Sequence, residues 1–265
     1  MTDDSLFDQL AEAIGDETPI ALATIVSGEH AGAKMLVNLD GVVGGSLGHP
    51  DLDRVVARDA AGELAAGTSG IRHYGPAGEA REDDVGVFVE SYAPPPHMLI
   101  FGAVDFTASL CRVAKVLGYR VTVCDARPVF ATTQRFPYAD RVVVDWPHRL
   151  LQEVGPELGQ RDAICVLTHD PKFDVPAVLE ALKTKVGYLG AMGSRRTTDD
   201  RNRRLLDEGA THEQLNRIMA PIGLDLGART PEETAISICG EIIALRSGRL
   251  APSLRDSEGS IHRAV

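Results

Sequence analysis

The order of apolar segments in the second part of the chain constrains the fold more than any other feature. From residue 97 onward, short segments that are apolar at almost every position alternate with segments that are apolar on one helical face. A strand that is apolar throughout is buried on both faces, which is typical of a parallel sheet between two layers of helices. We therefore predict an α/β domain over residues 97–250 with a Rossmann-like, doubly wound parallel sheet. Its predicted strands are Met98–Phe101, Val121–Cys124, Val142–Val144, Ala163–Leu167 and Val186–Leu189.

Three consecutive prolines, Pro94–Pro96, mark the boundary of this domain. Consecutive prolines hold the backbone extended and cannot donate to a sheet. Before them, we expect a smaller α+β module over residues 1–93, and after the domain we expect a polar tail over residues 251–265. The elements expected in the module are a helix at Leu6–Ile14, a strand at Ile20–Val26, a hairpin turning at Asp40-Gly41, a helix at Asp51–Ala66 and a strand at Val85–Val89.

The chain carries a formal net charge of −11 over 265 residues. Nucleic acids and anionic membrane surfaces attract basic proteins, so neither is expected as a partner. No apolar segment reaches the length of a membrane span, and the first 17 residues hold six acidic side chains and no Lys or Arg, unlike a secretory leader. We therefore expect a cytoplasmic protein. The four cysteines lie apart from one another among apolar residues, which favours buried free thiols over a metal site.

The turn after the first predicted strand, Gly102–Thr107, lies where dinucleotide-binding domains carry a glycine-rich loop. Val104 replaces the second glycine of that pattern, and Asp105 adds a negative charge where a phosphate would bind. Asp125 follows 23 residues after Gly102, at the position of a ribose-binding carboxylate. Two interpretations stay open: a dinucleotide site, or a doubly wound domain that binds no dinucleotide at this turn, with Asp125 solvated.

Two further loops are predicted to meet the same edge of the sheet, because parallel strands all end there. One contains Thr168 and His169, and the other spans Gly190–Arg196 with two glycines, a hydroxyl group and two guanidinium groups at the start of a helix. Backbone N–H groups at a helix N-terminus and arginine side chains together bind anions, so Ser194 and Arg195 are predicted to form an anion site. The alternatives are a solvated helix face, whose arginines pair with acidic neighbours, and a His169 that hydrogen-bonds the scaffold.

Several segments carry a family likeness, in the same order along the chain. The most specific is Tyr188–Arg195, with the sequence Tyr-Leu-Gly-Ala-Met-Gly-Ser-Arg. Over nearly its whole length the chain resembles the XdhC/CoxI family, accessory proteins of xanthine dehydrogenase and carbon monoxide dehydrogenase. The other matching segments are Gly32–Met35, Gly45–Gly48, Phe101–Ala103, Asp125–Pro128, Arg135–Pro137, Thr168–His169, Pro221–Ala228 and Thr230–Glu233.

The resemblance implies a two-domain protein, often a homodimer, that matures molybdenum hydroxylases. In that role it binds the molybdenum cofactor (molybdopterin), supports its sulfuration and delivers it to the hydroxylase apoenzyme, with a cysteine desulfurase as a further partner. A cofactor-binding chaperone is thus expected rather than an enzyme, and no catalytic residue or metal ligand is assigned. The residues expected to bind the cofactor are Gly102, Asp125, Thr168, His169, Gly190, Gly193, Ser194 and Arg195.

The sequence departs from the family pattern where members commonly carry thiols. Asp51 stands in place of a cysteine and Arg81-Glu82 in place of a Cys-Gly pair, so residues 1–93 contain no thiol. Thiol chemistry is therefore not expected in the N-terminal module, whereas cofactor binding by the second domain depends less on these positions. Two other functions stay open: an NAD(P)-dependent oxidoreductase, in which Asp125 binds the ribose and His169 acts as acid or base, and a scaffold for the hydroxylase that binds no small molecule.

Overall fold

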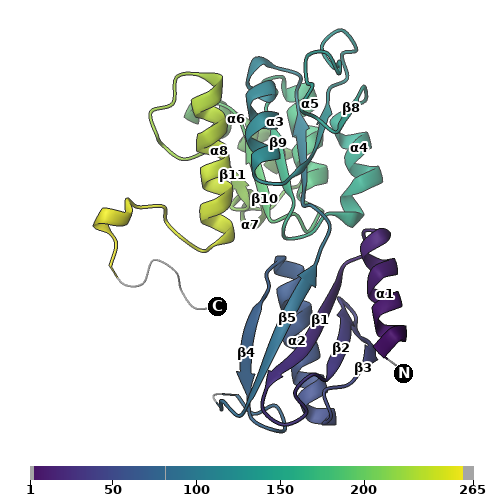
Figure 1. Ribbon diagram of the computed structural model, residues 1–265. Coiled ribbons are helices and arrows are strands. Elements are labelled where there is room, and N and C mark those ends of the chain that lie inside the picture. The colour runs from purple at the N-terminus through teal and green to yellow at the C-terminus, as the bar shows by residue number, and fades with distance from the viewer. Residues whose placement is uncertain (1–2, 81, 259–265) are drawn as a thin grey trace. The chain divides into compact units, whose positions relative to one another are not determined.

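The computed structural model of the chain describes residues 3–80 and 82–258, drawn in colour in Figure 1. The chain divides into two compact units, of which the first ends at Pro94 and the second begins at Pro95. The predicted family position Arg81 and the end of the expected tail, residues 259–265, lie outside the described residues. Within the part that is described, no helix is both long and apolar enough to cross a membrane.

The N-terminal unit contains an antiparallel sheet with the strand order β3-β2-β1-β5-β4 (Figure 1). Side chains alternate along β1 (Ile20–Ser27), so Ala21 and Ile25 pack under α2 (Pro50–Ala66), while Ile20 packs with α1 (Asp3–Gly15) on the other face. The predicted hairpin at Asp40-Gly41 is confirmed. The remaining strands are β2 (Lys34–Asn38), β3 (Gly41–Gly45), β4 (Gly70–Tyr74) and β5 (Val85–Tyr92).

The C-terminal unit contains a six-stranded sheet with the order β11-β10-β9-β6-β7-β8, in which all neighbouring strands are parallel. Renumbered from β6 as the first strand and read from the β8 edge, this order is 3-2-1-4-5-6, the order of dinucleotide-binding folds. The prediction of a Rossmann-like, doubly wound parallel sheet is therefore confirmed. The strands are β6 (His97–Phe101), β7 (Arg120–Cys124), β8 (Arg141–Val143), β9 (Ala163–Val166), β10 (Tyr188–Ala191) and β11 (Ile218–Met219).

Helices cover both faces of this sheet. On one face, α3 (Asp105–Val116) and α8 (Pro231–Arg246) pack against strand residues such as Met98 and Ile100. On the other face, Leu99 and Phe101 meet α4 (Pro147–Val154), α5 (Pro171–Ala181) and α6 (Arg195–Asp207). Short helices complete the unit: η1 (Gly155–Glu157), α7 (His212–Leu215) and η2 (Leu254–Asp256). All four cysteines are free and buried, as predicted.

Several strands differ from the sequence-based expectation. Among them, β8 ends at Val143 rather than Val144, β9 at Val166 rather than Leu167, and β5 at Tyr92 rather than Val89. β10 begins at Tyr188 rather than Val186, because Gly187 lies in a turn that packs against the carbonyl of Gln160. The edge strands β4 and β11 were not predicted. β4 exposes alternate side chains and β11 has only two residues, so neither produces a continuous apolar segment.

Candidate functional site

The strand order creates a topological switch point between β6 and β9. From β6 the chain continues to β7 and β8 on one side, and then crosses to β9 on the other side. In open α/β sheets, ligands bind outside the carboxyl ends of the strands at such a point. We call the loops that follow β6, β7, β9 and β10 the carboxyl edge; they comprise residues 102–105, 125–136, 168–170 and 192–195.

Gly102 and Thr168 lie side by side at the switch point. Gly102 has a φ of +116°, and a Cβ atom there would lie 2.8 Å from Thr168 Cγ2 and 3.0 Å from Thr168 N. Glycine is therefore required at this position both by its backbone conformation and by the close approach of the two loops. The Thr168 hydroxyl is buried and has no hydrogen-bond partner among the described residues. A buried hydroxyl without a partner is costly, so this group is a candidate to bind a ligand.

Asp125 lies at the end of β7 with its side chain only 3% exposed. Its Oδ1 accepts hydrogen bonds from the backbone N–H (2.9 Å) and Nε (2.9 Å) of Arg127. Its Oδ2 accepts from Arg127 Nη2 (2.7 Å) and from the Ala103 N–H (2.8 Å). Burial alone would raise the pKa of Asp125, but these donors outweigh it and lower the pKa. Since a carboxylate offers about four acceptor positions, a ribose hydroxyl would have to displace an existing bond.

Arg127 and Arg135 lie on either side of the first loop of the carboxyl edge. Arg127 closes over Asp125, and Arg135 Nη1 donates to the carbonyl of Ala103 (3.1 Å). Both guanidinium groups stack on Phe130, with Cζ 4.6 Å and 5.6 Å from the ring centroid. Both arginines lie in segments that carry the family likeness, Asp125–Pro128 and Arg135–Pro137, but the sequence alone assigns them no role. An exposed aromatic residue between two arginines was the signal that could have found them.

The predicted residue after Thr168 is solvated, and the residue that follows it is structural. His169 is exposed. Its neighbour Asp170 caps α5, because its Oδ1 accepts the Lys172 N–H at 3.0 Å. The loop therefore brings one buried polar group, the hydroxyl of Thr168, to the carboxyl edge beside an exposed imidazole.

The loop between β10 and α6 holds the remaining predicted residues. Gly190 lies inside β10, where a Cβ atom would lie 2.5 Å from Ile222 Cδ1, so protein fills the space above it. Gly193 has a φ of +152°. Ser194 is the N-cap of α6 and accepts the Thr197 N–H at 3.2 Å. Arg195 is exposed at the first turn of this helix.

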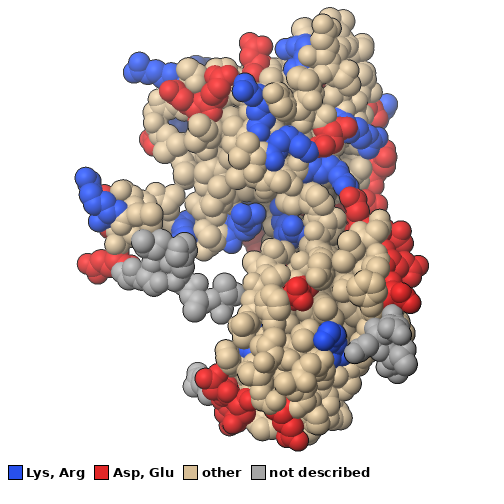
Figure 2. All heavy atoms as spheres, viewed as in Figure 1, with Lys and Arg blue, Asp and Glu red and all other residues tan. Residues whose placement is uncertain are grey.

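The arginines of α6 have different environments. Arg201 is buried below the loop, where its Nη2 donates to the carbonyl of Met192 and its Nε lies 3.9 Å from Asp174 Oδ2. Arg203 is exposed and pairs with Asp200 at 3.3 Å. The arginines at and after the start of α6 therefore do not form a single basic surface. The face of the C-terminal unit that is visible in Figure 2, which α3 and α8 cover, likewise carries both basic and acidic side chains.

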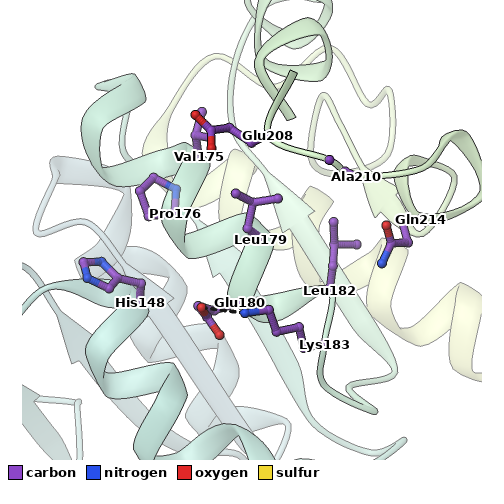
Figure 3. Close-up of a pocket in the computed structure, with 11 residues that line it drawn as sticks. His148, Val175, Pro176, Leu179, Glu180, Leu182, Lys183, Glu208, Ala210 and Gln214 are labelled. Atoms are coloured by element: carbon purple, nitrogen blue, oxygen red, sulfur yellow. Dashed lines mark hydrogen bonds and ion pairs between the residues drawn. The ribbon is translucent and has the colours of Figure 1, made fainter. Parts of the chain in front are cut away.

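A hollow of about 460 Å³ lies elsewhere in the C-terminal unit, against α5 (Figure 3). Its lining includes Leu182 and Glu208, which follow the last turns of α5 and α6. Two charged groups of its lining already pair with each other, since Lys183 Nζ lies 2.8 Å from Glu180 Oε1. The hollow contains none of the predicted site residues, so the carboxyl edge remains the candidate site.

Comparison with known proteins identifies relatives over both units. Residues 98–242 match the XdhC Rossmann domain, and residues 13–75 match the XdhC and CoxI family. A crystal structure of a xanthine dehydrogenase from Bacillus halodurans has the same fold, with a TM-score of 0.55 and 22% identity over 96% of this chain and 98% of that one.

Three curated relatives each match the chain over half of their own length or less. A protein of Bacillus subtilis, named as a probable xanthine dehydrogenase subunit, is 32% identical over 60% of this chain and 46% of the relative. "Uncharacterized protein YqeB" of Escherichia coli is 26% identical over 98% and 50%, respectively. "Molybdenum cofactor insertion chaperone PaoD" of Escherichia coli is 25% identical over 60% and 43%. The chain thus spans about half the length of these relatives, and on the family matches it belongs to the XdhC and CoxI family, whose Rossmann domain forms its C-terminal unit.

Proposed function

We propose that this protein is an accessory protein of a molybdenum hydroxylase, one that binds the molybdenum cofactor at the carboxyl edge and assists its insertion into the apoenzyme. The observation that carries the proposal is the geometry at the switch point. The buried hydroxyl of Thr168, which has no hydrogen-bond partner in the described part of the chain, lies there beside Gly102, at the position where Rossmann-like sheets bind ligands. The likeness to a relative named as a molybdenum cofactor insertion chaperone supports the choice of ligand.

The residues of the carboxyl edge suit such a cargo. Molybdopterin combines a pterin ring system, rich in hydrogen-bonding groups, with a phosphate. The edge offers a hydroxyl group at Thr168, guanidinium groups at Arg127 and Arg135, and exposed backbone and side-chain groups around Ser194. We propose that seven of the predicted residues border the site: Gly102, Asp125, Thr168, His169, Gly193, Ser194 and Arg195. The eighth, Gly190, lies inside β10 against Ile222 and is left out of the proposed site.

The proposal extends to the partners that the family resemblance implies. We infer a cytoplasmic homodimer that delivers the cofactor to a hydroxylase apoenzyme and receives sulfur from a cysteine desulfurase. Light scattering after size-exclusion chromatography tests the dimer, because a mass near 28.4 kDa, that of one chain, contradicts it. Pull-down with purified desulfurase and apo-hydroxylase tests the two partners separately.

Titration of the purified protein with molybdenum cofactor, released from a donor enzyme, tests the central claim. We expect saturable binding that Thr168→Val weakens, and lower activity of the partner hydroxylase in a strain without this gene. Absence of binding, together with full hydroxylase activity in that strain, contradicts the proposal. Impaired hydroxylase maturation without any binding of the cofactor instead favours a scaffold that binds no small molecule.

A further inference from the structure

Two arginines of the carboxyl edge, Arg127 and Arg135, flank the partly exposed ring of Phe130. We propose that they form the subsite for the phosphate group of a phosphomonoester or pyrophosphate ligand. The inference rests on the proposed function, which it deepens, because the pterin cargo carries such a phosphate. It also relocates the anion site predicted from the sequence, which centred on Ser194 and Arg195.

The guanidinium group of Arg127 retains N–H donors that do not bind Asp125. A guanidinium has five N–H groups, and the Nε–H and one Nη2–H of Arg127 bind Asp125, at 2.9 Å and 2.7 Å. The other three have no partner among the residues that the structure describes, and 45% of the side chain is exposed. The guanidinium group of Arg127 is therefore held in place by Asp125 on one side and is free to donate on the other, which suits bidentate binding of a phosphate.

The second guanidinium is held against the same ring. The Nη1 of Arg135 donates to two backbone carbonyls, of Ala103 at 3.1 Å and of Phe130 at 3.2 Å. Its Cζ lies 5.6 Å from the centroid of the Phe130 ring, on which Arg127 also stacks at 4.6 Å. Both cations are thus fixed before a ligand arrives, which reduces the entropy lost on binding.

The occupied carboxylate of Asp125 determines which chemistry this position accepts. Both of its oxygens already accept two hydrogen bonds, and it is 3% exposed. A ribose diol needs a free acceptor, whereas the group that reaches solvent here is the cation of Arg127. The position therefore favours a phosphate over an unmodified ribose.

Two acidic groups lie near the proposed subsite and give the proposal a second test. Asp105 is 90% exposed and lies 3.7 Å from Arg135 Nη2, and the charge of Asp170 acts on Arg127. A phosphate bound to Arg135 would have to replace Asp105 there. Removal of the Asp105 charge should therefore tighten binding, which a structural role of the arginine would not predict.

The N-terminus of α6 has less to offer a phosphate. The hydroxyl of Ser194 already caps the helix through the Thr197 N–H, and it also lies 2.9 Å from the hydroxyl of Thr197. Arg195 is exposed to solvent, so it is not held ready for a phosphate as Arg127 and Arg135 are. Of these two parts of the carboxyl edge, the one with Arg127 and Arg135 already holds two guanidinium groups in place and leaves donors free for a phosphate.

Isothermal titration of the full chain with inorganic pyrophosphate tests the subsite. We expect Arg135→Gln to weaken binding by about tenfold, the loss of one charge-assisted hydrogen bond, and Asp105→Asn to strengthen it by about threefold. Arg127→Lys keeps the charge beside Asp125 but loses the planar pair of donors of the guanidinium group, and it is also expected to weaken binding. Arg112→Gln is the matched control, because Arg112 likewise stacks on an aromatic ring, Tyr138 at 5.6 Å, outside the carboxyl edge.

The inference is overturned if Arg135→Gln and Asp105→Asn both leave the affinity within twofold of the wild type, as expected of the control. It is also overturned if Arg195→Gln is the substitution that weakens binding. Because Asp105 is exposed, its variant is expected to fold even if an arginine variant does not, and circular dichroism checks each variant.

A parallel titration with molybdenum cofactor separates this inference from the proposed function. Cofactor binding without any response to these variants refutes the subsite and leaves the proposed function standing. A pyrophosphate response as predicted, without cofactor binding by the wild type, refutes the proposed function and supports the anion subsite. Weakening of both ligands by Arg135→Gln supports both proposals.

Discussion

Arg201 and Asp174 form a buried charged pair between α5 and α6, with Arg201 Nε 3.9 Å from Asp174 Oδ2 and each side chain 4% exposed. The pair is incompletely hydrogen-bonded: Arg201 Nε and Nη1 and Asp174 Oδ1 have no partner among the described residues. Arg201 also donates to the carbonyl of Met192, so the pair connects α5 to the loop that carries Ser194. A charge pair that is inside the protein and imperfectly bonded costs stability in itself, but removal of one partner costs more.

At about pH 8, where Asp174 is charged in the wild type, Arg201→Met should destabilise the protein by about 3–5 kcal/mol, because it leaves this carboxylate buried without a counter-charge. Urea unfolding measures the effect. Arg203→Met is the control, since this exposed arginine pairs with Asp200 at 3.3 Å, and a change below about 1 kcal/mol is expected. The double variant Asp174→Leu/Arg201→Met should be more stable than Arg201→Met alone. A single variant as stable as the wild type would contradict this account.

The same pair predicts a pH dependence of stability. Burial raises the pKa of Asp174 from 3.8 to about 7, with Arg201 opposing the rise and Asp170 adding to it. The folded state then binds more protons than the unfolded state between these values, so the stabilisation is complete at low pH and is lost as the pH rises through about 7. When the pH rises from about 5 to about 8, the free energy of unfolding of the wild type should therefore fall by about 1–3 kcal/mol relative to that of Asp174→Asn. Equal pH profiles would refute the prediction.

Gly102→Ala should cost more stability than an alanine at an unhindered glycine. Both Gly102 (φ +116°) and Gly118 (φ +81°) have a left-handed backbone, but a Cβ atom at Gly118 meets nothing within 4 Å, whereas at Gly102 it lies 2.8 Å from Thr168. We expect about 1 kcal/mol for Gly118→Ala and at least about 2 kcal/mol for Gly102→Ala, measured by urea unfolding. Equal costs would mean that backbone conformation alone requires the glycine.

Thr168→Val should separate stability from binding. Valine has the shape of threonine and removes a buried hydroxyl that has no partner among the described residues. The free energy of unfolding should stay constant or rise by up to about 1 kcal/mol, because an unsatisfied polar group is lost. Affinity for the molybdenum cofactor should fall in the same variant. A clear loss of stability would instead show that the hydroxyl is bonded in solution.

The four thiols should react slowly in the native protein. Burial raises the pKa of Cys111, Cys124 and Cys239 to about 12, and that of Cys165 well above its usual value. Since the thiolate is the reactive form, we expect modification by a disulfide reagent at least about a hundredfold slower than in denaturant. A cysteine that reacts rapidly in the folded protein would identify a thiol able to accept sulfur.

Hydrophobic periodicity and local turn signals were sufficient for the architecture. The apolar segments beginning at Met98 and Ala163 predicted a parallel sheet because burial on both faces accounts for a strand without polar positions. Asp40-Gly41 predicted the hairpin because its turn is decided within a few residues. β11 escaped prediction because its two residues are held by pairing with β10, which is distant in sequence.

The chemistry at the strand ends was decided by tertiary contacts. In the sequence, Asp125 had the position of a free ribose ligand, yet Ala103, from another loop, and Arg127 occupy its oxygens in the folded chain. Arg201 belonged to a basic segment, yet it lies on the same face of α6 as the buried Leu205 and therefore packs inward. The sequence determined which side chains reach the carboxyl edge, because periodicity sets where strands end. Only the tertiary structure determined which of them stay free to bind, because that depends on partners supplied by distant segments.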